Sequence, residues 1–260
     1  LLGPQRRGMM ARMYRPSLAD RLRFLAGLPL SLIYVPIMLL TGLAYALMPK
    51  GLFARLQEDN RRKEIDARMA AMVGVAKPGD RVLDVGAGRG DFLKAIGPAL
   101  GAETIGFDII DYSDDDIDIG MFDGKTIPLE GKSVDVSMAA FVLHHTRDQA
   151  DLLGEMKRVT RRRIVIFEDT WFTPWQYLFV VWNDFYSNIA MGSIKAIRDQ
   201  GKFAIVAMPM PLTFRRVAAW ERFFREQGLT VLQTRVRHAK IKPMSKVTFV
   251  LGVAGDDPLG

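Results

Sequence analysis

The residues with the clearest chemical potential form a glycine-rich loop at Gly86, Gly88 and Gly90, within the run RVLDVGAGRGDF. An apolar stretch that contains Asp84 precedes this loop. The pattern is typical of a strand that enters a tight turn and opens a helix, where backbone can approach a nucleotide-like ligand closely. The third glycine falls one position earlier than in the dinucleotide-binding fingerprint, so a different nucleotide-like ligand is indicated.

A second group of reactive side chains follows two later apolar runs. His144 and His145, two of the three histidines in the chain, follow one run, and Glu168 and Asp169 end the next. Histidine exchanges protons near neutral pH, and a carboxylate can orient it or bind a hydroxyl or amine. We predict that His145, or else His144, acts on substrate with support from Glu168 or Asp169. Simple packing or helix capping is the alternative. The four residues lack a metal-binding spacing such as H-x-E, so no metal site is expected.

These residues need a scaffold that brings them to one edge. Apolar runs predict strands at 81–85, 104–108, 134–139 and 163–167, with a further strand near 117–121. Helical periodicity predicts helices at 91–100, 149–159 and 216–227, and two late strands lie at 230–237 and 246–252. The alternation predicts an α/β fold with a mostly parallel sheet, helices on both faces, and ligand at the carboxyl ends of the strands.

Three landmarks occur in order along the chain: DVGAGRG, the FD that ends in Asp108, and a D-G-x-x-IPL…VLHH run that starts at Asp123. Together they resemble class I S-adenosylmethionine (SAM) methyltransferases. The last run is similar to the ubiquinone/menaquinone-type, methyltransferase 11-like family. The resemblance covers roughly residues 67–170. It implies a Rossmann-like seven-stranded sheet of order 3-2-1-4-5-7-6 with an antiparallel seventh strand.

The same resemblance implies SAM as the cofactor and assigns roles to two carboxylates. Asp108 would accept hydrogen bonds from both ribose hydroxyls, and Asp123 would face the adenine amino group. A helix cap and a plain turn aspartate are the respective alternatives. The expected cofactor-binding residues are Asp84, Gly86, Ala87, Gly88, Gly90, Asp108, Ile109, Asp123, Gly124 and Ala140.

Composition restricts the partners. The chain has no cysteine, which excludes disulfides and thiolate metal sites. Of the net charge of +7, residues 1–66 carry +6, and the remaining residues are close to neutral. The predicted catalytic domain therefore lacks the basic surface of a nucleic-acid enzyme. The segment after the fourth predicted strand reads AAFVLHH rather than the N/D-P-P-Y/F of DNA amino-methyltransferases, so no nucleic-acid partner is expected.

The basic N-terminal region surrounds 26 uncharged residues between Arg23 and Lys50. This length suffices to span a bilayer, but Pro29 and Pro36 interrupt helical hydrogen bonding. We favour a monotopic hairpin, broken near Pro36, on anionic lipids at the cytoplasmic face, over a single span. A buried helix is the alternative. The predicted division is a membrane-association segment at 1–51, a connecting helix at 52–80 and a methyltransferase domain at 81–254.

The run Trp171–Ile194 holds three of the four tryptophans and is interrupted by Asn183, Asp184 and Tyr186. Such a run suits an apolar substrate site, a membrane-interface belt or a buried helix. The combined prediction is a membrane-associated SAM-dependent methyltransferase that acts on a lipid or an isoprenoid/quinone-like small molecule. A membrane-anchored SAM-binding adaptor without turnover and a methyltransferase of a soluble small molecule are the alternatives. The acceptor atom stays open.

Overall fold

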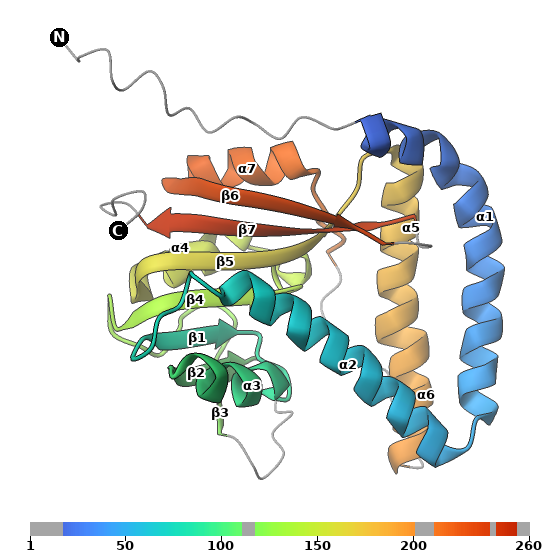
Figure 1. The fold of residues 1–260 in the computed structure, drawn as a ribbon, viewed down its shortest axis with the longest axis horizontal. Coiled ribbons are helices and arrows are strands. Elements are labelled where there is room, and N and C mark those ends of the chain that lie inside the picture. The colour runs from blue at the N-terminus through green and yellow to red at the C-terminus, as the bar shows by residue number, and fades with distance from the viewer. Residues whose placement is uncertain (1–17, 111–117, 201–210, 240–242, 254–260) are drawn as a thin grey trace.

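The computed structural model describes residues 18–110, 118–200, 211–239 and 243–253, and its seven strands form one sheet (Figure 1). The order is β3-β2-β1-β4-β5-β7-β6, with β1 to β5 parallel and β7 antiparallel to both neighbours. This confirms the expected order and the antiparallel seventh strand. The strands are β1 (Arg81–Val85), β2 (Glu103–Asp108), β3 (Ile119–Met121), β4 (Val134–Ala140), β5 (Thr160–Thr170), β6 (Leu229–His238) and β7 (Ser245–Val253).

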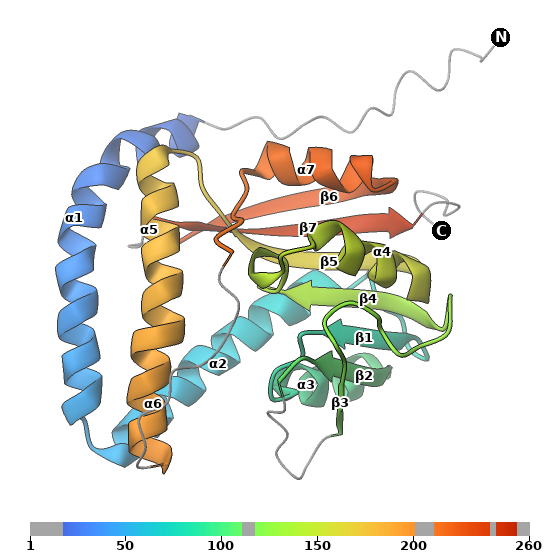
Figure 2. The same cartoon turned by 180° about the vertical axis from the view of Figure 1, so that it is seen from behind.

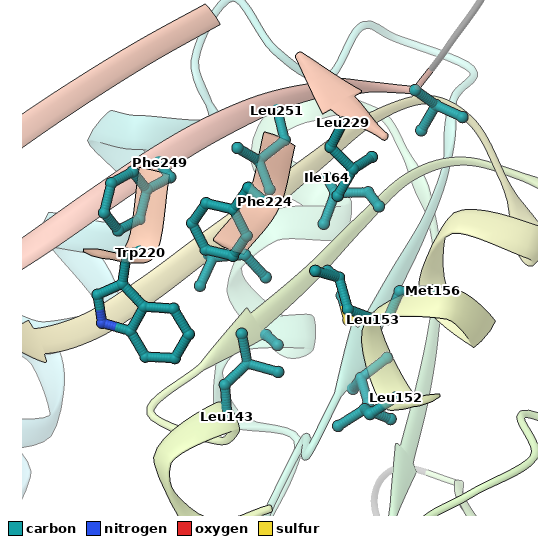
Figure 3. Packing of buried hydrophobic residues seen from close by; sticks show 14 of the residues in the cluster. Leu143, Leu152, Leu153, Met156, Ile164, Trp220, Phe224, Leu229, Phe249 and Leu251 are labelled. Carbon is teal, nitrogen blue, oxygen red and sulfur yellow. The ribbon is translucent and has the colours of Figure 1, made fainter. Parts of the chain in front are cut away.

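Helices cover both faces of the sheet, as predicted. Figures 1 and 2 show α2 (Lys50–Met72) and α3 (Asp91–Leu100) on one face, with α4 (Gln149–Val159) and α7 (Val217–Glu226) on the other. Helix α7 places Trp220 and Phe224 one turn apart, and their stacked rings contact the sheet through Phe249 of β7 (Figure 3). Such apolar stripes at helical spacing explain why these segments fold as helices against a sheet.

Strand β5 is longer than the predicted 163–167. The centre of the strand, Arg163–Phe167, pairs with both β4 and β7, whereas Thr160 pairs with β4 alone and Glu168–Thr170 pair with β7 alone. The extension carries Glu168 and Asp169 inside the strand instead of just beyond it. Pairing with strands that are distant in sequence therefore sets the length of β5. The prediction from apolar residues alone was too short.

A layer of helices stands at the end of the sheet toward which β1 and β2 point (Figures 1 and 2). It consists of α1 (Leu18–Leu47), lying beside α5 (Pro174–Phe185), a π-helical turn at Tyr186–Ala190, and α6 (Met191–Gln200). Met38 of α1 packs in one cluster with Phe179 of α5, and the Tyr186 hydroxyl donates to the Met38 carbonyl at 2.5 Å.

The predicted break near Pro36 is wrong, because α1 continues through Pro29 and Pro36 as one helix. Each internal proline costs about 3 kcal/mol. Packing on α5 opposes this cost, and Arg198 of α6 donates three hydrogen bonds of 2.6–2.9 Å to the carbonyls at Tyr45, Ala46 and Met48. Over the described ranges, none of the helices combines the length and the apolar character needed to cross a membrane. Residues 1–17, which hold part of the basic charge, lie outside those ranges.

Candidate active site

The glycine loop joins β1 to α3 and is shaped by left-handed backbone. Gly86, Gly88 and Gly90 have φ of +76°, +56° and +71°, a region that favours glycine. A Cβ at Gly86 would lie 2.3 Å from Cγ2 of Val142, so the loop touches the segment after β4. The N–H groups of Gly86 and Ala87 donate to the Phe107 carbonyl at 2.8 and 3.1 Å. The loop is thus anchored between the ends of β2 and β4.

Asp108 ends β2 and is nearly buried, at 7% exposure. Its Oδ2 accepts the N–H of Gly88 at 2.8 Å, and its Oδ1 accepts the N–H of Ile110 at 3.0 Å. Each carboxylate oxygen can accept a further hydrogen bond. Asp108 therefore sits where it can hold two neighbouring hydroxyls, which is the arrangement that a ribose requires.

Asp123 lies in an exposed turn after β3. Its Oδ1 accepts the N–H groups of Thr126 and Lys125 at 2.7 and 2.8 Å, and these bonds lower the pKa of its carboxyl. The turn role that was the alternative reading is therefore present, and Oδ2 is the atom left to face an adenine amino group. A Cβ at Gly124 would lie 3.1 Å from Ile109 Cγ2, so these two predicted residues are neighbours. Ala140 ends β4 opposite Phe167.

Asp84 is fully buried in β1, and neither of its carboxylate oxygens has a hydrogen-bond partner among the described residues. Burial raises the pKa of Asp84 to about 7, against the opposing charge of Arg68. Arg68, on α2, likewise has an unpartnered buried Nε, and its guanidinium lies 5.7 Å from the ring centroid of Phe141. The sequence contained no signal for Arg68, because only the docking of α2 brings it here. The two opposite charges fit the ammonium and carboxylate of a SAM molecule.

His144 is held by Glu168. The imidazole is 2% exposed, and its Nδ1–H donates to Glu168 Oε2 at 2.5 Å, while Glu168 Oε1 accepts the Leu143 N–H at 2.9 Å. Burial by itself lowers the pKa of His144, but the charge of Glu168 and the nearby Asp184 carboxylate outweigh it and raise the pKa to about 10. Phe214 stacks on the ring, with centroids 4.5 Å apart. The predicted pairing of a histidine with a carboxylate from the neighbouring strand is thus present.

Asp184 joins the two histidines from α5. Its Oδ1 lies 3.7 Å from Nε2 of His144 and 3.6 Å from Nε2 of His145. Buried polar atoms without a described partner gather along the same part of α5, namely Asp184 Oδ2, Asn183 Oδ1 and Trp182 Nε1. Unsatisfied buried groups are costly, so such a concentration indicates a place for a polar ligand. The aromatic run of α5 therefore also offers polar atoms to a ligand.

Asp169 does not join this group. Successive residues of a strand point to opposite sides, so Asp169 faces away from its neighbour Glu168. It pairs in register with Lys246 of β7, and burial raises its pKa to about 6 against the charges of Lys246 and His144. Of the four predicted catalytic residues, the fold therefore brings together His144, His145 and Glu168.

A family model described as a methyltransferase domain matches residues 83–166, which include the glycine loop, Asp108 and both histidines. Residues 83–166 are therefore similar to a methyltransferase domain. SAM is the cofactor of this methyltransferase domain, and the unpartnered Asp84, the glycine loop and Asp108 fit it. The match ends before Glu168, so the roles of Glu168 and Asp184 are inferred from geometry alone.

One curated relative is the "Uncharacterized 37.1 kDa protein in transposon TN4556" of Streptomyces fradiae. It is 32% identical over 112 residues, which are 37% of this chain and 32% of the relative. The chain thus matches about a third of that relative's length. The activity, substrates and partners of the whole protein are accordingly matters for proposal.

Solved structures share the fold at low identity. A complex of the Haloferax volcanii Trm112 methyltransferase activator with a methyltransferase matches at 17% identity and a TM-score of 0.51, covering 76% of this chain and 96% of that chain. YcgJ of Bacillus subtilis matches at 15% and 0.51, covering 73% and 98%. The [4+2]-cyclase SpnF matches at 12% and 0.51, covering 75% and 81%. At such identities the likeness shows the fold alone, and SpnF is named for a different reaction.

Proposed function

We propose that this protein is a SAM-dependent methyltransferase that works at the cytoplasmic face of a membrane and methylates a lipid or an isoprenoid/quinone-like molecule. The observation that carries the proposal is the double character of α5. It brings Asp184 to His144 and His145, and the same helix exposes the apolar side chains of Trp175, Leu178 and Phe185. A single helix thus connects the reactive cluster with an apolar surface.

The cofactor-binding residues are those around the glycine loop. Asp84 and Arg68 would hold the amino-acid end, Asp108 the ribose, and Ile109 with Asp123 the adenine. When bound, SAM would supply a methyl group from its positively charged sulfur, and the bond between the methyl carbon and the sulfur breaks as the acceptor attacks that carbon. The protein's part is to align the acceptor and exclude water. His145 and Asp184 would meet the acceptor's polar group, and Glu168 would keep His144 oriented.

The apolar surface of α1 supports membrane association. Leu40 and Leu43 are 66% and 59% exposed, and the other exposed apolar residues of the helix continue the same surface: Leu32, Ile33, Ile37, Leu39 and Leu47. The neighbouring helices α5 and α6 also expose apolar side chains, namely Trp175, Leu178, Phe185 and Ile197. Contiguous apolar surface of this kind marks membrane or partner sites. A lipid surface is favoured as the occupant, because residues 1–66 carry a charge of +6 that would attract anionic headgroups.

The membrane part is tested by sedimentation with vesicles of equal parts phosphatidylcholine and phosphatidylglycerol. Burying one leucine side chain contributes about 1.5–3 kcal/mol, so Leu40→Glu should weaken vesicle binding at least tenfold. Val73→Glu is the matched control, because Val73 is 64% exposed but lies at the far end of α2. Equal binding by both variants would contradict α1 as the contact surface.

The reaction is tested by incubating the protein with methyl-labelled SAM and a fractionated lipid extract, followed by mass spectrometry of the labelled product. We expect the label in an apolar fraction. A label found only in the aqueous metabolite fraction would replace the lipid substrate with a soluble one. SAM binding without any transfer would favour the adaptor without turnover.

A further inference from the structure

We propose that His144, His145 and Asp184 form a binding site for one divalent transition-metal ion. One donor atom from each residue can be chosen so that all three lie within 4.8 Å of one another. The two imidazole-to-carboxylate separations are 3.7 and 3.6 Å. Around a zinc ion at about 2.0–2.1 Å, tetrahedral donors lie roughly 3.4 Å apart, so the two imidazole-to-carboxylate pairs need only a small contraction, and the imidazole pair starts within 4.8 Å.

The surroundings of the three residues resemble the supports of established metal ligands. A metal-bound histidine usually donates its other ring N–H to a carboxylate, which fixes the tautomer. Glu168 accepts the Nδ1–H of His144 in this way, and Nε2 of the same ring faces Asp184, so a metal ion would take the place of the Nε2 proton. Asp184 Oδ1 in turn accepts a hydrogen bond of 2.8 Å from Asn188 Nδ2. Asn188 belongs to the π-helical turn that follows α5, an irregularity frequent at functional sites.

A second observation points to a ligand. Asp184 is 8% exposed, and its Oδ2 has no partner among the described residues. A buried, unpartnered carboxylate oxygen beside two imidazoles would gain a partner from a cation at this place. Glu168 adds a second negative charge within contact of His144, so the site favours a positive ligand.

The donor set restricts the metal. Two imidazole nitrogens and one carboxylate oxygen suit zinc, iron, cobalt or nickel, and are too nitrogen-rich for calcium or magnesium. Three protein ligands leave at least one coordination position open. That position would take an oxygen of the acceptor, a role that rests on the proposed function. A hydroxyl, enol or phenol is therefore the favoured acceptor group.

The site is tested by titrating Zn²⁺ into the tag-free, chelator-treated full chain by calorimetry, with metal content of the purified protein measured by mass spectrometry. We expect one ion per chain, and at least a tenfold loss of affinity in Asp184→Asn and in His145→Asn. The controls are His238→Asn and Asp151→Asn, which remove the same side-chain types outside the cluster and should bind as the parent does. Because all four variants are also titrated with SAM, a misfolded variant is recognised by its loss of SAM binding.

Failure to bind one ion per chain in the parent would overturn the proposal, as would unchanged affinity in Asp184→Asn. Loss of binding in His238→Asn alone would place the ion elsewhere and overturn it too. These outcomes are separate from the proposed function, because SAM affinity and methyl transfer to lipid are measured without reference to zinc.

Discussion

Replacing Gly86 with alanine would add a methyl group at the tightest point of the cofactor loop. The backbone φ of +76° costs an alanine about 1–2 kcal/mol. The new Cβ would also lie 2.3 Å from Val142 Cγ2, and relieving such overpacking costs about 1–3 kcal/mol. We expect Gly86→Ala to lower the free energy of unfolding by about 2–5 kcal/mol in urea denaturation, and to weaken SAM binding at least tenfold in calorimetry.

The steric cost of Gly86→Ala can be separated from its backbone cost. Val142→Ala removes the clashing methyl groups and alone costs about 1 kcal/mol for a half-buried valine. In the double variant only the backbone cost and the cost of the lost valine methyl groups remain. Its loss in free energy of unfolding should therefore be about 1–3 kcal/mol smaller than the sum of the losses in the two single variants. Gly88→Ala, with φ +56° and open space at its Cβ, should show the backbone cost alone. Gly154→Ala, on helix α4 with no atom within 4 Å of the added Cβ, should leave stability unchanged or raise it slightly.

Strict additivity of Gly86→Ala and Val142→Ala would refute this reasoning, because it would mean that the two side chains do not meet. An unfolding cost for Gly88→Ala equal to that for Gly86→Ala would also refute it, since only Gly86 faces an obstacle. A stable Gly86→Ala variant with unchanged SAM affinity would show that the loop does not approach the cofactor.

Three further predictions concern single side chains. Asp108→Asn puts an amide NH₂ group against the N–H of either Gly88 or Ile110, so SAM affinity should fall about tenfold to 100-fold in calorimetry. The control Asp118→Asn, at an exposed position just before β3, should leave SAM affinity unchanged. Burial raises the folded-state pKa of Asp84 to about 7 from 3.8, so its contribution to the free energy of unfolding is lost as the pH rises between those values. In urea denaturation at several pH values, Asp84→Asn should therefore make the free energy of unfolding depend less on pH over this range. A bound ammonium would favour ionised Asp84, so SAM binding at about pH 6 should release a proton, detected as a buffer-dependent heat, and a buffer-independent heat would contradict the pairing. Arg198→Met removes three hydrogen bonds to the end of α1, so amide hydrogen exchange over residues 38–48 should accelerate at least tenfold. The control Arg222→Met should leave this exchange unchanged, and equal protection in both variants would disprove the capping role of Arg198.

Much of the fold followed from local patterns. The glycine loop, the strand that ends at Asp108 and the last two strands were predicted within a few residues, because each depends on spacing and apolar character over short stretches, whereas the antiparallel pairing of the last strands was implied by the family resemblance. The length of β5 was underestimated, because strand pairing on both sides extends it beyond its apolar centre. The cofactor site was predictable for the same local reason, since its glycines and Asp108 lie on one βαβ unit.

The sequence by itself predicted a glycine loop that resembles those of methyltransferases, a carboxylate for the ribose and a pair of histidines that act on substrate, because each of these predictions depends on residues that are close together in the chain. Only the tertiary structure decided which groups stand beside them. Asp184 reaches the histidines from α5, at the carboxyl edge of the sheet, whereas α2, which covers one face of the sheet, brings the charge of Arg68 near Asp84. Helix α1 continues through Pro36 while it packs on α5, and its last carbonyls are bound by Arg198, some 150 residues away. Proline costs are local and readable, whereas the contacts that offset them arise only when distant elements dock.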